Sequence, residues 1–383
     1  MLVVVVLVAA GAGYGYLQYR WGQVATAPCT SCATVADGAP YNVLVVGSDS
    51  REGETAAEAQ QFGDESNAAG QRSDTIKVIH VDPATGTASV LSIPRDTFVT
   101  ITGLPAGTGI AADNKINASF NNGPDALIQT IQATFGIPIN HYIVVNFFGL
   151  QDAVDALGGI SLDFPYPVRD SDDGNNNSGL SIPTAGCQVL DGSQALSLSR
   201  SRYYQYEVDG VWHADPTSDI GRIERQNIIM EAVLDKGKST INPIRLNSLL
   251  GSVVHDFTVD DGLTPEDLLA LATRYHAFSG SDLVTYTLPT TGGTSPYAGD
   301  VEVVSTPAAQ QMITTFLGTG PDPVTTPPLD ADGQPQVVPA VASASASGAT
   351  TAAAPATSSA ASTAAPTTAT TAPAVPSYDP TPC

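Results

Sequence analysis

Residues 74–96 read Asp-Thr-Ile-Lys-Val-Ile-His-Val-Asp-Pro-Ala-Thr-Gly-Thr-Ala-Ser-Val-Leu-Ser-Ile-Pro-Arg-Asp. Two runs rich in β-branched and apolar side chains flank the short turn Pro83-Ala-Thr-Gly86, which predicts a pair of antiparallel strands. Antiparallel pairing sets the two outer ends of a hairpin side by side. We therefore expect the motif Pro94-Arg-Asp96 to lie next to the motif Arg72-Ser-Asp74, although about 20 residues separate them in the chain.

The rest of the chain alternates between strand and helix patterns. Apolar runs bounded by turn residues predict strands at 41–46, 74–82, 87–93, 142–148, 160–164 and 283–288. Apolar residues at helical spacing predict helices at 124–135, 148–157, 191–198, 220–236 and 264–275. The polar stretches 52–71 and 168–181 are expected to form loops. Because a hairpin interrupts the alternation, we expect an α/β fold with a central mixed sheet and helices on its faces.

Composition limits the class of partner and the size of the core. The 383 residues include 15 Lys and Arg against 38 Asp and Glu, a formal net charge of -23, which argues against nucleic acid as a partner. From about Gln334 the chain is mostly Ala, Thr, Pro, Ser and Val, with no large apolar side chains to bury, so we expect disorder there. The rest of the chain, residues 41 to about 320, is long enough for one sizeable core. The expected divisions are an anchor (1–20), a linker with a cysteine pair (21–40), a catalytic domain (41–320) and a disordered tail (321–383).

The N-terminus carries an uncharged apolar run over residues 2–17. A membrane span needs ~20 apolar residues, with a lower limit of about 17, so the run is borderline. It lacks the basic segment of a signal peptide, and a missing basic segment ahead of Met1 would explain this. We predict a transmembrane anchor. The alternatives are a signal peptide cleaved after Ala25-Thr-Ala27, which Pro28 disfavours, and a buried helix.

The chain has four cysteines, Cys29, Cys32, Cys187 and Cys383. The pair Cys29-Thr-Ser-Cys32 has the spacing of a redox or zinc half-site, but no second Cys or His pair completes a zinc site and no helix of the thioredoxin type is expected after it. In an exported chain we expect a structural disulfide from Cys29 or Cys32 to Cys187. Cys383 would then be free or form an intermolecular bond.

Six arginines are concentrated in four short stretches, 72–74, 94–96, 200–202 and 219–226. The arginine side chain presents a planar fork of donors that fits phosphate oxygens, so the stretches favour an anion site. A helix N-terminus, such as the one expected near residue 220, also favours anions. If residues 198–203 are extended, the two arginines there point to the same side. The alternative is that these arginines pair with surface carboxylates.

Two aspartates at strand ends, Asp49 and Asp74, are candidate metal ligands, because Mg²⁺ prefers oxygen ligands and often uses one or two carboxylates plus substrate phosphates. A capping or turn role is the alternative for each. Lys115 is a candidate phosphate contact or a solvated surface lysine. His80 lies between apolar residues of a strand, and we expect a structural role for it.

Five stretches, 41–51, 72–76, 92–97, 115–120 and 200–226, occur in an order that resembles the LytR-CpsA-Psr family. The resemblance implies an α-β-α sandwich with a pocket for a lipid tail. It further implies a single-pass membrane enzyme whose catalytic domain lies outside the cytoplasmic membrane of a Gram-positive bacterium. Such an enzyme transfers a glycopolymer from a polyprenyl diphosphate carrier to peptidoglycan through a phosphodiester link. The cofactor implied is Mg²⁺, with Mn²⁺ as the alternative.

The resemblance also assigns roles by position. It implies Asp49 and Asp74 as metal ligands, Arg95, Asp96 and Asp219 as catalytic residues, and Arg72, Lys115, Arg200, Arg202, Arg222, Arg225 and Gln226 as contacts of the diphosphate. Either aspartate, Asp96 or Asp219, could orient an arginine or accept the proton of the acceptor hydroxyl. Apolar side chains that could line the lipid pocket, or equally form ordinary core, are Leu127, Ile131, Phe135, Val154 and Leu157.

Three functions remain open at this point: the transferase, a lipid diphosphate pyrophosphatase with water as acceptor, and a non-catalytic wall-binding anchor. The composition and the cysteine pattern resemble actinobacterial members of the family, which suggests an arabinogalactan-like or teichoic-type polymer. The sequence does not identify the polymer, the general base, the disulfide pairing, the oligomeric state or the true start codon.

Overall fold

The structure is a computed structural model that describes residues 16, 18–48, 73–104, 110–171, 178–217, 219–239, 256–267, 282–319, 323–330, 334–335 and 378–383. Within these ranges no helix has both the length and the apolar character that a membrane crossing requires. Most of the expected anchor, residues 1–15 and 17, lies outside the described residues.

A mixed seven-stranded sheet forms the centre of the molecule, in the order β1-β14-β7-β2-β3-β4-β15. Its strands are β1 Ala25–Ala27, β2 Tyr41–Ser48, β3 Ser73–Asp82, β4 Thr87–Ile93, β7 His141–Val145, β14 Phe257–Asp260 and β15 Val284–Thr287. The neighbours β2, β3 and β4 are antiparallel, whereas β7 is parallel to β2 and β15 is parallel to β4. The predicted hairpin and the predicted mixed sheet are both confirmed.

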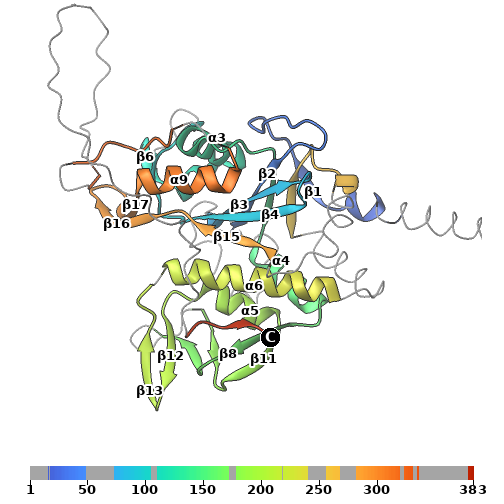
Figure 1. Cartoon of the computed structure of the whole chain (residues 1–383), viewed down its shortest axis with the longest axis vertical. Coiled ribbons are helices and arrows are strands. Elements are labelled where there is room, and N and C mark those ends of the chain that lie inside the picture. Colours follow the sequence, from blue (N-terminus) through green and yellow to red (C-terminus); the bar gives the residue numbers. More distant parts are fainter. Residues whose placement is uncertain are drawn as a thin grey trace, which may run out of the picture.

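One face of the sheet is covered by α3 Pro124–Phe135 and α9 Thr306–Leu317, with the short 3-10 helix η2 Ile116–Asn122 beside α3 (Figure 1). Helix α3 has the predicted bounds. Pro124 stands at its first position, and Gly136 follows it in the left-handed conformation at φ 64°. Leu127, Ile131 and Phe135 are 0% exposed in the core between helix and sheet. They are therefore core residues, not pocket lining.

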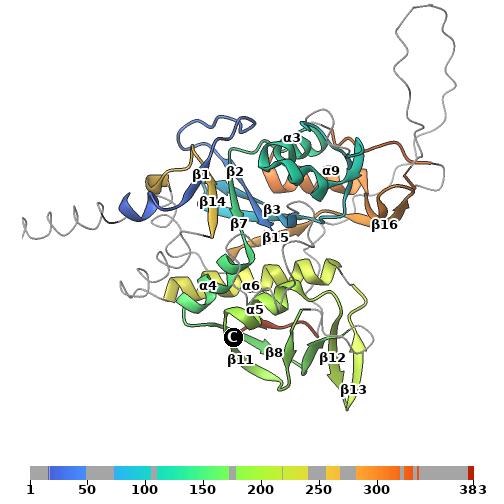
Figure 2. The same ribbon diagram turned by 180° about the vertical axis from the view of Figure 1, so that it is seen from behind.

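The opposite face is covered by α4 Phe147–Ala156, α5 Gly192–Arg200 and α6 Asp219–Ser239 (Figures 1 and 2). The side chain of Asn146 caps α4 by accepting from the backbone N–H of Gly149. Asp191 and Gln194 form a reciprocal capping box at the start of α5. With helices on both faces of the sheet, the chain has the predicted α-β-α arrangement.

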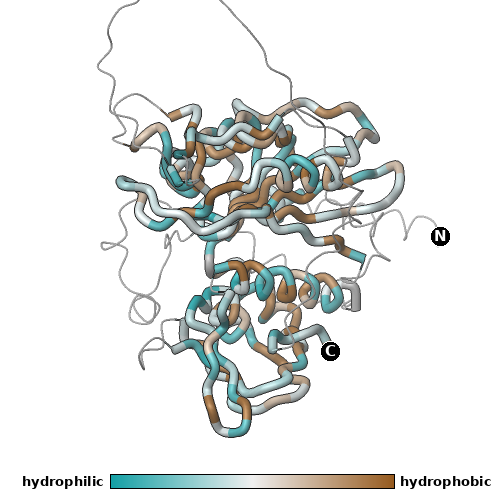
Figure 3. The backbone as a smooth tube through the Cα atoms, turned by 60° about the vertical axis from the view of Figure 1, so that its left-hand side comes forward, coloured by the Kyte–Doolittle hydropathy of each residue, from teal (hydrophilic) through white to brown (hydrophobic). Residues whose placement is uncertain are grey.

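Below these helices lie two small sheets. One has the order β10-β9-β12-β13 and the other the order β11-β8-β18. Their strands are β8 Ile160–Phe164, β9 Val168–Asp170, β10 Ser181–Ile182, β11 Gly186–Leu190, β12 Tyr204–Val208, β13 Val211–Ala214 and β18 Thr381–Pro382. They pack with α4, α5 and α6 around a second core that contains Val154, and Leu157 is 4% exposed. We call these two sheets together with α4, α5 and α6 the lower half of the molecule, and the central sheet with α3 and α9 the upper half. Figure 3 shows apolar stretches inside both halves.

Two smaller pairs of strands complete the fold: β5 Phe98–Thr100 with β6 Asp113–Lys115, and β16 Thr290–Ser295 with β17 Gly299–Val304. The stretch 168–181 differs from the predicted loop at both ends, since β9 and β10 begin and end it, while residues 172–177 lie outside the described residues. Of the predicted helix 264–275 the structure describes the first turn, where the Oγ1 of Thr264 accepts from the backbone N–H of Asp267.

The two disulfides are Cys29–Cys32 and Cys187–Cys383, so the predicted link to Cys187 and the predicted state of Cys383 are both wrong. The tertiary structure explains which cysteines pair. Cys29 and Cys32 pack against the core beneath α3, whereas Cys187 lies on β11 in the lower half. Strand β18 pairs with β8, the neighbour of β11, and this brings Cys383 to Cys187.

The end of the chain is also built into the lower half. We expect disorder over residues 321–383, and for residues 324–325 and 378–383 this is wrong. Val324 packs in the main core at 7% exposure, and the backbone N–H of Thr325 donates to the carbonyl of Thr134 at 2.8 Å. The ring of Tyr378 stacks on Tyr206 at 4.5 Å between centroids, and Asp379 is buried at 2% exposure. Residues 336–377 lie outside the described residues.

Candidate functional site

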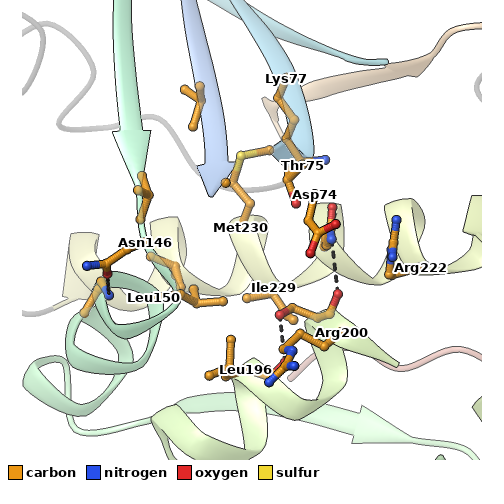
Figure 4. A pocket seen from close by; sticks show the side chains of 18 of the residues that line it. Asp74, Thr75, Lys77, Asn146, Leu150, Leu196, Arg200, Arg222, Ile229 and Met230 are labelled. Atoms are coloured by element: carbon orange, nitrogen blue, oxygen red, sulfur yellow. Dashed lines mark hydrogen bonds between the residues drawn. The ribbon is translucent and has the colours of Figure 1, made fainter. Parts of the chain in front are cut away.

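A cavity of about 630 Å³ lies between the central sheet and the helices α4, α5 and α6 (Figure 4). Strands β2, β3, β7 and β14 contribute to one side of it and the three helices to the other. The residues that line it are Val45, Gly47, Asp74, Thr75, Lys77, Val145, Asn146, Gly149, Leu150, Ala153, Asp170, Leu196, Ser199, Arg200, Arg202, Tyr203, Arg222, Gln226, Ile229, Met230, Val233 and Phe257.

The cavity is polar at one end and apolar along the rest. Helix α6 contributes Arg222 and Gln226 first and then Ile229, Met230 and Val233, so the lining changes from cationic to apolar along the helix axis. Figure 4 shows the same order, with Arg222 at one end and Leu150 towards the other. A cavity of this kind can hold an amphipathic molecule with an anionic head and an apolar tail.

Helix geometry and packing together decide which polar residues of α6 reach the cavity. At 3.6 residues per turn, Gln226 lies about 40° to one side of Arg222 around the helix and Arg225 about 60° to the other. The packing of α6 turns the side of Gln226 towards the cavity and the side of Arg225 away from it. Arg222 and Gln226 accordingly line the cavity. The side chain of Gln226 also donates to the carbonyl of Ser199 at 3.1 Å, which ties α6 to α5.

Arg225 does not match the expected role as a contact of the diphosphate. It is 0% exposed, and its guanidinium pairs with Asp215 at 2.7 Å and with Asp379 at 3.2 Å. It also donates to the carbonyl of Ser201 at 3.2 Å and lies over the ring of Tyr204 at 4.2 Å. Its partners are structural groups of the lower half, including the end of the chain.

The two ends of the hairpin meet as expected from antiparallel pairing. Arg95 forms a short ion pair with Asp74, and the same carboxylate lies 3.8 Å from Arg202. On the other side Arg95 lies 3.6 Å from Asp96, which in turn lies 3.3 Å from Lys115. These residues therefore form a chain of alternating charges at the polar end. Arg72 lies outside the described residues.

Arg200 and Arg202 both line the cavity, although the condition of an extended stretch at residues 198–203 is not met. Arg200 is the last residue of α5, and Ser201 follows it with φ -63° and ψ 116°. The carboxylate of Asp170, 1% exposed, accepts from the hydroxyl of Ser201 and from the backbone N–H groups of Arg202 and Tyr203. Asp170 thus fixes the backbone that presents Arg202.

Arg95 and Arg222 stay protonated at neutral pH. Burial by itself would lower the pKa of Arg95, but the nearby carboxylates, Asp74 and Asp96 first among them, more than offset it and the pKa is raised. Burial lowers the pKa of the Arg222 guanidinium to about 10, against the opposing effect of Asp219, with which it pairs at 2.9 Å. Both guanidinium groups therefore carry full positive charge when a substrate arrives.

Sequence reasoning missed two residues of the site, Asp170 and Lys77. Lys77 is 5% exposed on β3, where Ile76 and Val78 are buried as well. A lysine inside a strand whose neighbours are apolar was the available signal, because a charged group in such a place needs a reason. Asp170 gave no such signal, since its partners come from a segment about 30 residues away.

The candidate metal ligands are only partly described. Asp74 lies at the polar end of the cavity, and its carboxylate is the type of donor that Mg²⁺ prefers. Asp49 lies outside the described residues, but Ser48 pairs with Ser73, so the residues that precede the two aspartates are neighbours in the sheet. In the part of the chain that the structure describes, no three His, Cys, Asp or Glu side chains gather closely enough to hold a metal ion by themselves.

Comparison with known families identifies the architecture. Residues 23–316 match the model of the LytR_cpsA_psr family. The chain belongs to this family. A probable cell wall biosynthesis protein LcpB of Corynebacterium glutamicum is 32% identical over 291 residues, which is 75% of this chain and 63% of that protein. A polyisoprenyl-teichoic acid–peptidoglycan teichoic acid transferase, TagV of Bacillus subtilis, is 29% identical over 57% of this chain and 51% of that protein. The chain thus spans between half and two thirds of these two relatives.

Solved structures show the same fold. A LytR-Csp2A-Psr enzyme from Actinomyces oris superposes with a TM-score of 0.59 at 23% identity and covers 78% of this chain and 97% of its own. The crystal structure of TagV from B. subtilis superposes with a TM-score of 0.54 at 23% identity and covers 75% of this chain and 100% of its own. The predicted LytR-CpsA-Psr fold is confirmed.

Proposed function

We propose that the protein transfers a cell-wall glycopolymer from a polyprenyl diphosphate carrier to peptidoglycan. The observation that carries the proposal is the cavity, whose apolar length suits an isoprenoid chain and whose arginine-lined end suits a diphosphate. The names of relatives that act on teichoic acid and peptidoglycan support this reaction and favour a teichoic-type polymer as the donor.

The proposed reaction is a phosphoryl transfer. A hydroxyl of peptidoglycan attacks the phosphorus that carries the glycan, and a new phosphodiester bond forms. The bond between this phosphorus and the bridging oxygen breaks, and polyprenyl phosphate leaves with the electron pair. The proton of the hydroxyl passes to a carboxylate, for which Asp96 and Asp219 are the two candidates.

The residues of the polar end act by position and charge. Arg200, Arg202 and Arg222 hold the two phosphates and neutralise the charge that spreads over their oxygens as the bond breaks. Arg95 lies behind Asp74 and keeps its carboxylate in place. Asp96 links Arg95 to Lys115 in the same network.

The cofactor we propose is Mg²⁺, with Mn²⁺ as the alternative, held by Asp74 and Asp49 together with the phosphates of the substrate. When bound, the ion supplies further neutralisation of phosphate charge. We also propose that residues 1–20 anchor the chain in the membrane as a signal-anchor, with the catalytic domain outside the cell, where both lipid carrier and peptidoglycan are found.

The proposal is tested by a transfer assay with residues 21–383, which keep β1 and the disulfide-bound end of the chain. A short polyprenyl-diphosphate glycan and a peptidoglycan oligomer are supplied with Mg²⁺, and the products are analysed by mass spectrometry. We expect a phosphodiester-linked product that disappears with EDTA. Arg202→Ala should abolish transfer with little change in stability. Arg169→Ala is the control, because Arg169 lies over Trp212 and does not line the cavity.

The other outcomes point to the alternative functions. Cleavage of the diphosphate without a linked product would indicate a pyrophosphatase. Glycan binding that survives Asp74→Ala and needs no metal, without turnover, would indicate a wall-binding anchor. Normal transfer by Arg202→Ala would refute the assignment of this arginine to the diphosphate.

A further inference from the structure

Lys77 is a buried lysine on an inner strand of the central sheet. In the register of the sheet it stands between Val45 of β2 and Ser92 of β4, and it is 5% exposed. Its side chain lines the cavity (Figure 4). The proposed reaction assigns no role to this residue.

The amino group of Lys77 has neutral partners. Its Nζ donates to the Oγ of Ser92 at 2.8 Å and to the Oδ1 of Asn227 at 2.5 Å. An ammonium has three donors, so these two acceptors leave one for another group. Among the described residues no carboxylate lies within ion-pair distance of Lys77, and the charged group that most affects it is the guanidinium of Arg222.

The amino group lies next to the polar end of the cavity. A second, small cavity is lined by Lys77 together with Asp74, Arg95, Arg222 and Gln226, all of which belong to or adjoin the arginine-lined end. The site around Lys77 therefore combines a buried amine, a spare donor and an excess of positive charge, with Asp74 as the nearest carboxylate on the same strand. An anion that enters the polar end would remove this excess.

We propose that Lys77 is a further binding residue for the diphosphate, and that it takes up a proton when the diphosphate enters the cavity. This inference rests on the proposed function, since it names how the same site recognises its donor. A lysine that only tied β3 to β4 and α6 through Ser92 and Asn227 would have no such dependence on the ligand.

The electrostatics of the site give the direction of the effect. Burial first, and then Arg222, lower the pKa of Lys77 to about 7 in the free protein. The two negative charges of a diphosphate diester favour the ammonium and raise the pKa again. Below pH 6 the amine is protonated with and without ligand, so the charged amine still contributes to affinity but the affinity does not change with pH through this group. Above pH 7 affinity falls as pH rises, by up to about tenfold per pH unit when one proton is linked to binding.

Two other ionisable groups, His80 and Glu224, can be separated from Lys77 by substitution. His80 on the same strand contacts Asn42 and Phe316, on the side of α9. Glu224 on α6 belongs to the cluster around Arg225 and does not line the cavity. If proton uptake is lost when Lys77 is replaced and is kept when His80 or Glu224 is replaced, the proton is taken up by Lys77.

The test is titration calorimetry with geranyl diphospho-N-acetylglucosamine, a diester whose own phosphates do not titrate near neutral pH. Heats measured at pH 8 in two buffers of different ionisation enthalpy give the number of protons taken up. The chain is residues 21–383, with Lys77→Met as the variant and Lys236→Met as the control, because Lys236 lies on α6 outside the cavity. Thermal unfolding checks that each variant is folded.

We expect the wild-type protein and Lys236→Met to take up most of one proton at pH 8 and Lys77→Met to take up none. Affinity of Lys77→Met should be about tenfold weaker at pH 6 and approach that of the wild type at pH 9. Equal proton uptake by wild type and folded Lys77→Met, or no uptake by either, would overturn the inference, as would absence of binding. No acceptor is present, so a protein that binds with proton uptake but fails the transfer assay would refute the proposed reaction and leave this inference standing.

Discussion

Replacing Arg225 by methionine tests whether this arginine stabilises the fold, in contrast to the arginines that line the cavity. The guanidinium holds two carboxylates, Asp215 and Asp379, whose side chains are 1% and 0% exposed. Removing one partner of a buried ion pair costs about 3–5 kcal/mol, because the charge left behind has neither water nor a counter-ion. Against a domain stability of about 5–15 kcal/mol this is a large fraction.

The two carboxylates do not contribute equally to this cost. Burial raises the pKa of Asp379 to about 6, so this group can protonate near neutral pH when its partner is lost. Burial alone would also raise the pKa of Asp215, but hydrogen bonds from Thr217 and Arg225 hold it below its usual value. Most of the stability lost in Arg225→Met should therefore come from the unpaired charge of Asp215. Adding Asp379→Asn should recover a smaller part of the stability than adding Asp215→Asn.

Urea unfolding of the wild type, Arg225→Met and Arg202→Met measures the effect. Arg202 is the matched control, because its side chain is 40% exposed and surface ion pairs contribute about 0–1 kcal/mol. We expect Arg225→Met to lose about 3–5 kcal/mol of stability and, in its folded fraction, to bind a lipid diphosphate as the wild type does. Arg202→Met should keep its stability and lose binding. An Arg225→Met protein that is as stable as the wild type but does not bind would refute the structural assignment.

Three further predictions concern other parts of the molecule. Leu150→Asn puts an amide into the apolar wall of the cavity. At about 1–3 kcal/mol for an unpartnered polar group, affinity for geranyl diphosphate should fall by roughly 5- to 150-fold, while calorimetry with inorganic pyrophosphate should show no change. Cys383→Ser opens a disulfide that closes a separation of 196 residues, so the melting temperature should fall, with about 5 kcal/mol as the upper limit from chain entropy, and an unchanged value would contradict the role of this bond. Burial, and then Asp379, raise the pKa of Glu224 from 4.5 to about 7. The contribution of Glu224 to the stability of the fold is therefore full below pH 4.5 and is lost as pH rises through 7. In urea unfolding, Glu224→Gln should be more stable than the wild type at pH 8, and the difference should vanish below pH 4.5.

The local elements of the fold could be predicted because short-range rules govern them. The hairpin of β3 and β4 follows from two β-rich runs and a four-residue turn, and its pairing brought Arg95 to Asp74 across 21 residues. Helix α3 has its bounds because Pro124 and Gly136 punctuate it. The concentration of arginine in a strongly acidic chain likewise pointed to an anion site before any contact was known.

The sequence by itself determined the mixed sheet, the main helices and most of the polar end of the cavity. Only the tertiary structure decided that Arg225 faces the lower half while Arg222 faces the cavity, since both stand in the same turn of α6. It also decided the disulfide partners and the docking of residues 378–383, which depend on strands far apart in the chain. The physical reason is that propensity and spacing act over a few residues, whereas the direction of a helix face and the burial of Lys77 depend on what packs against them.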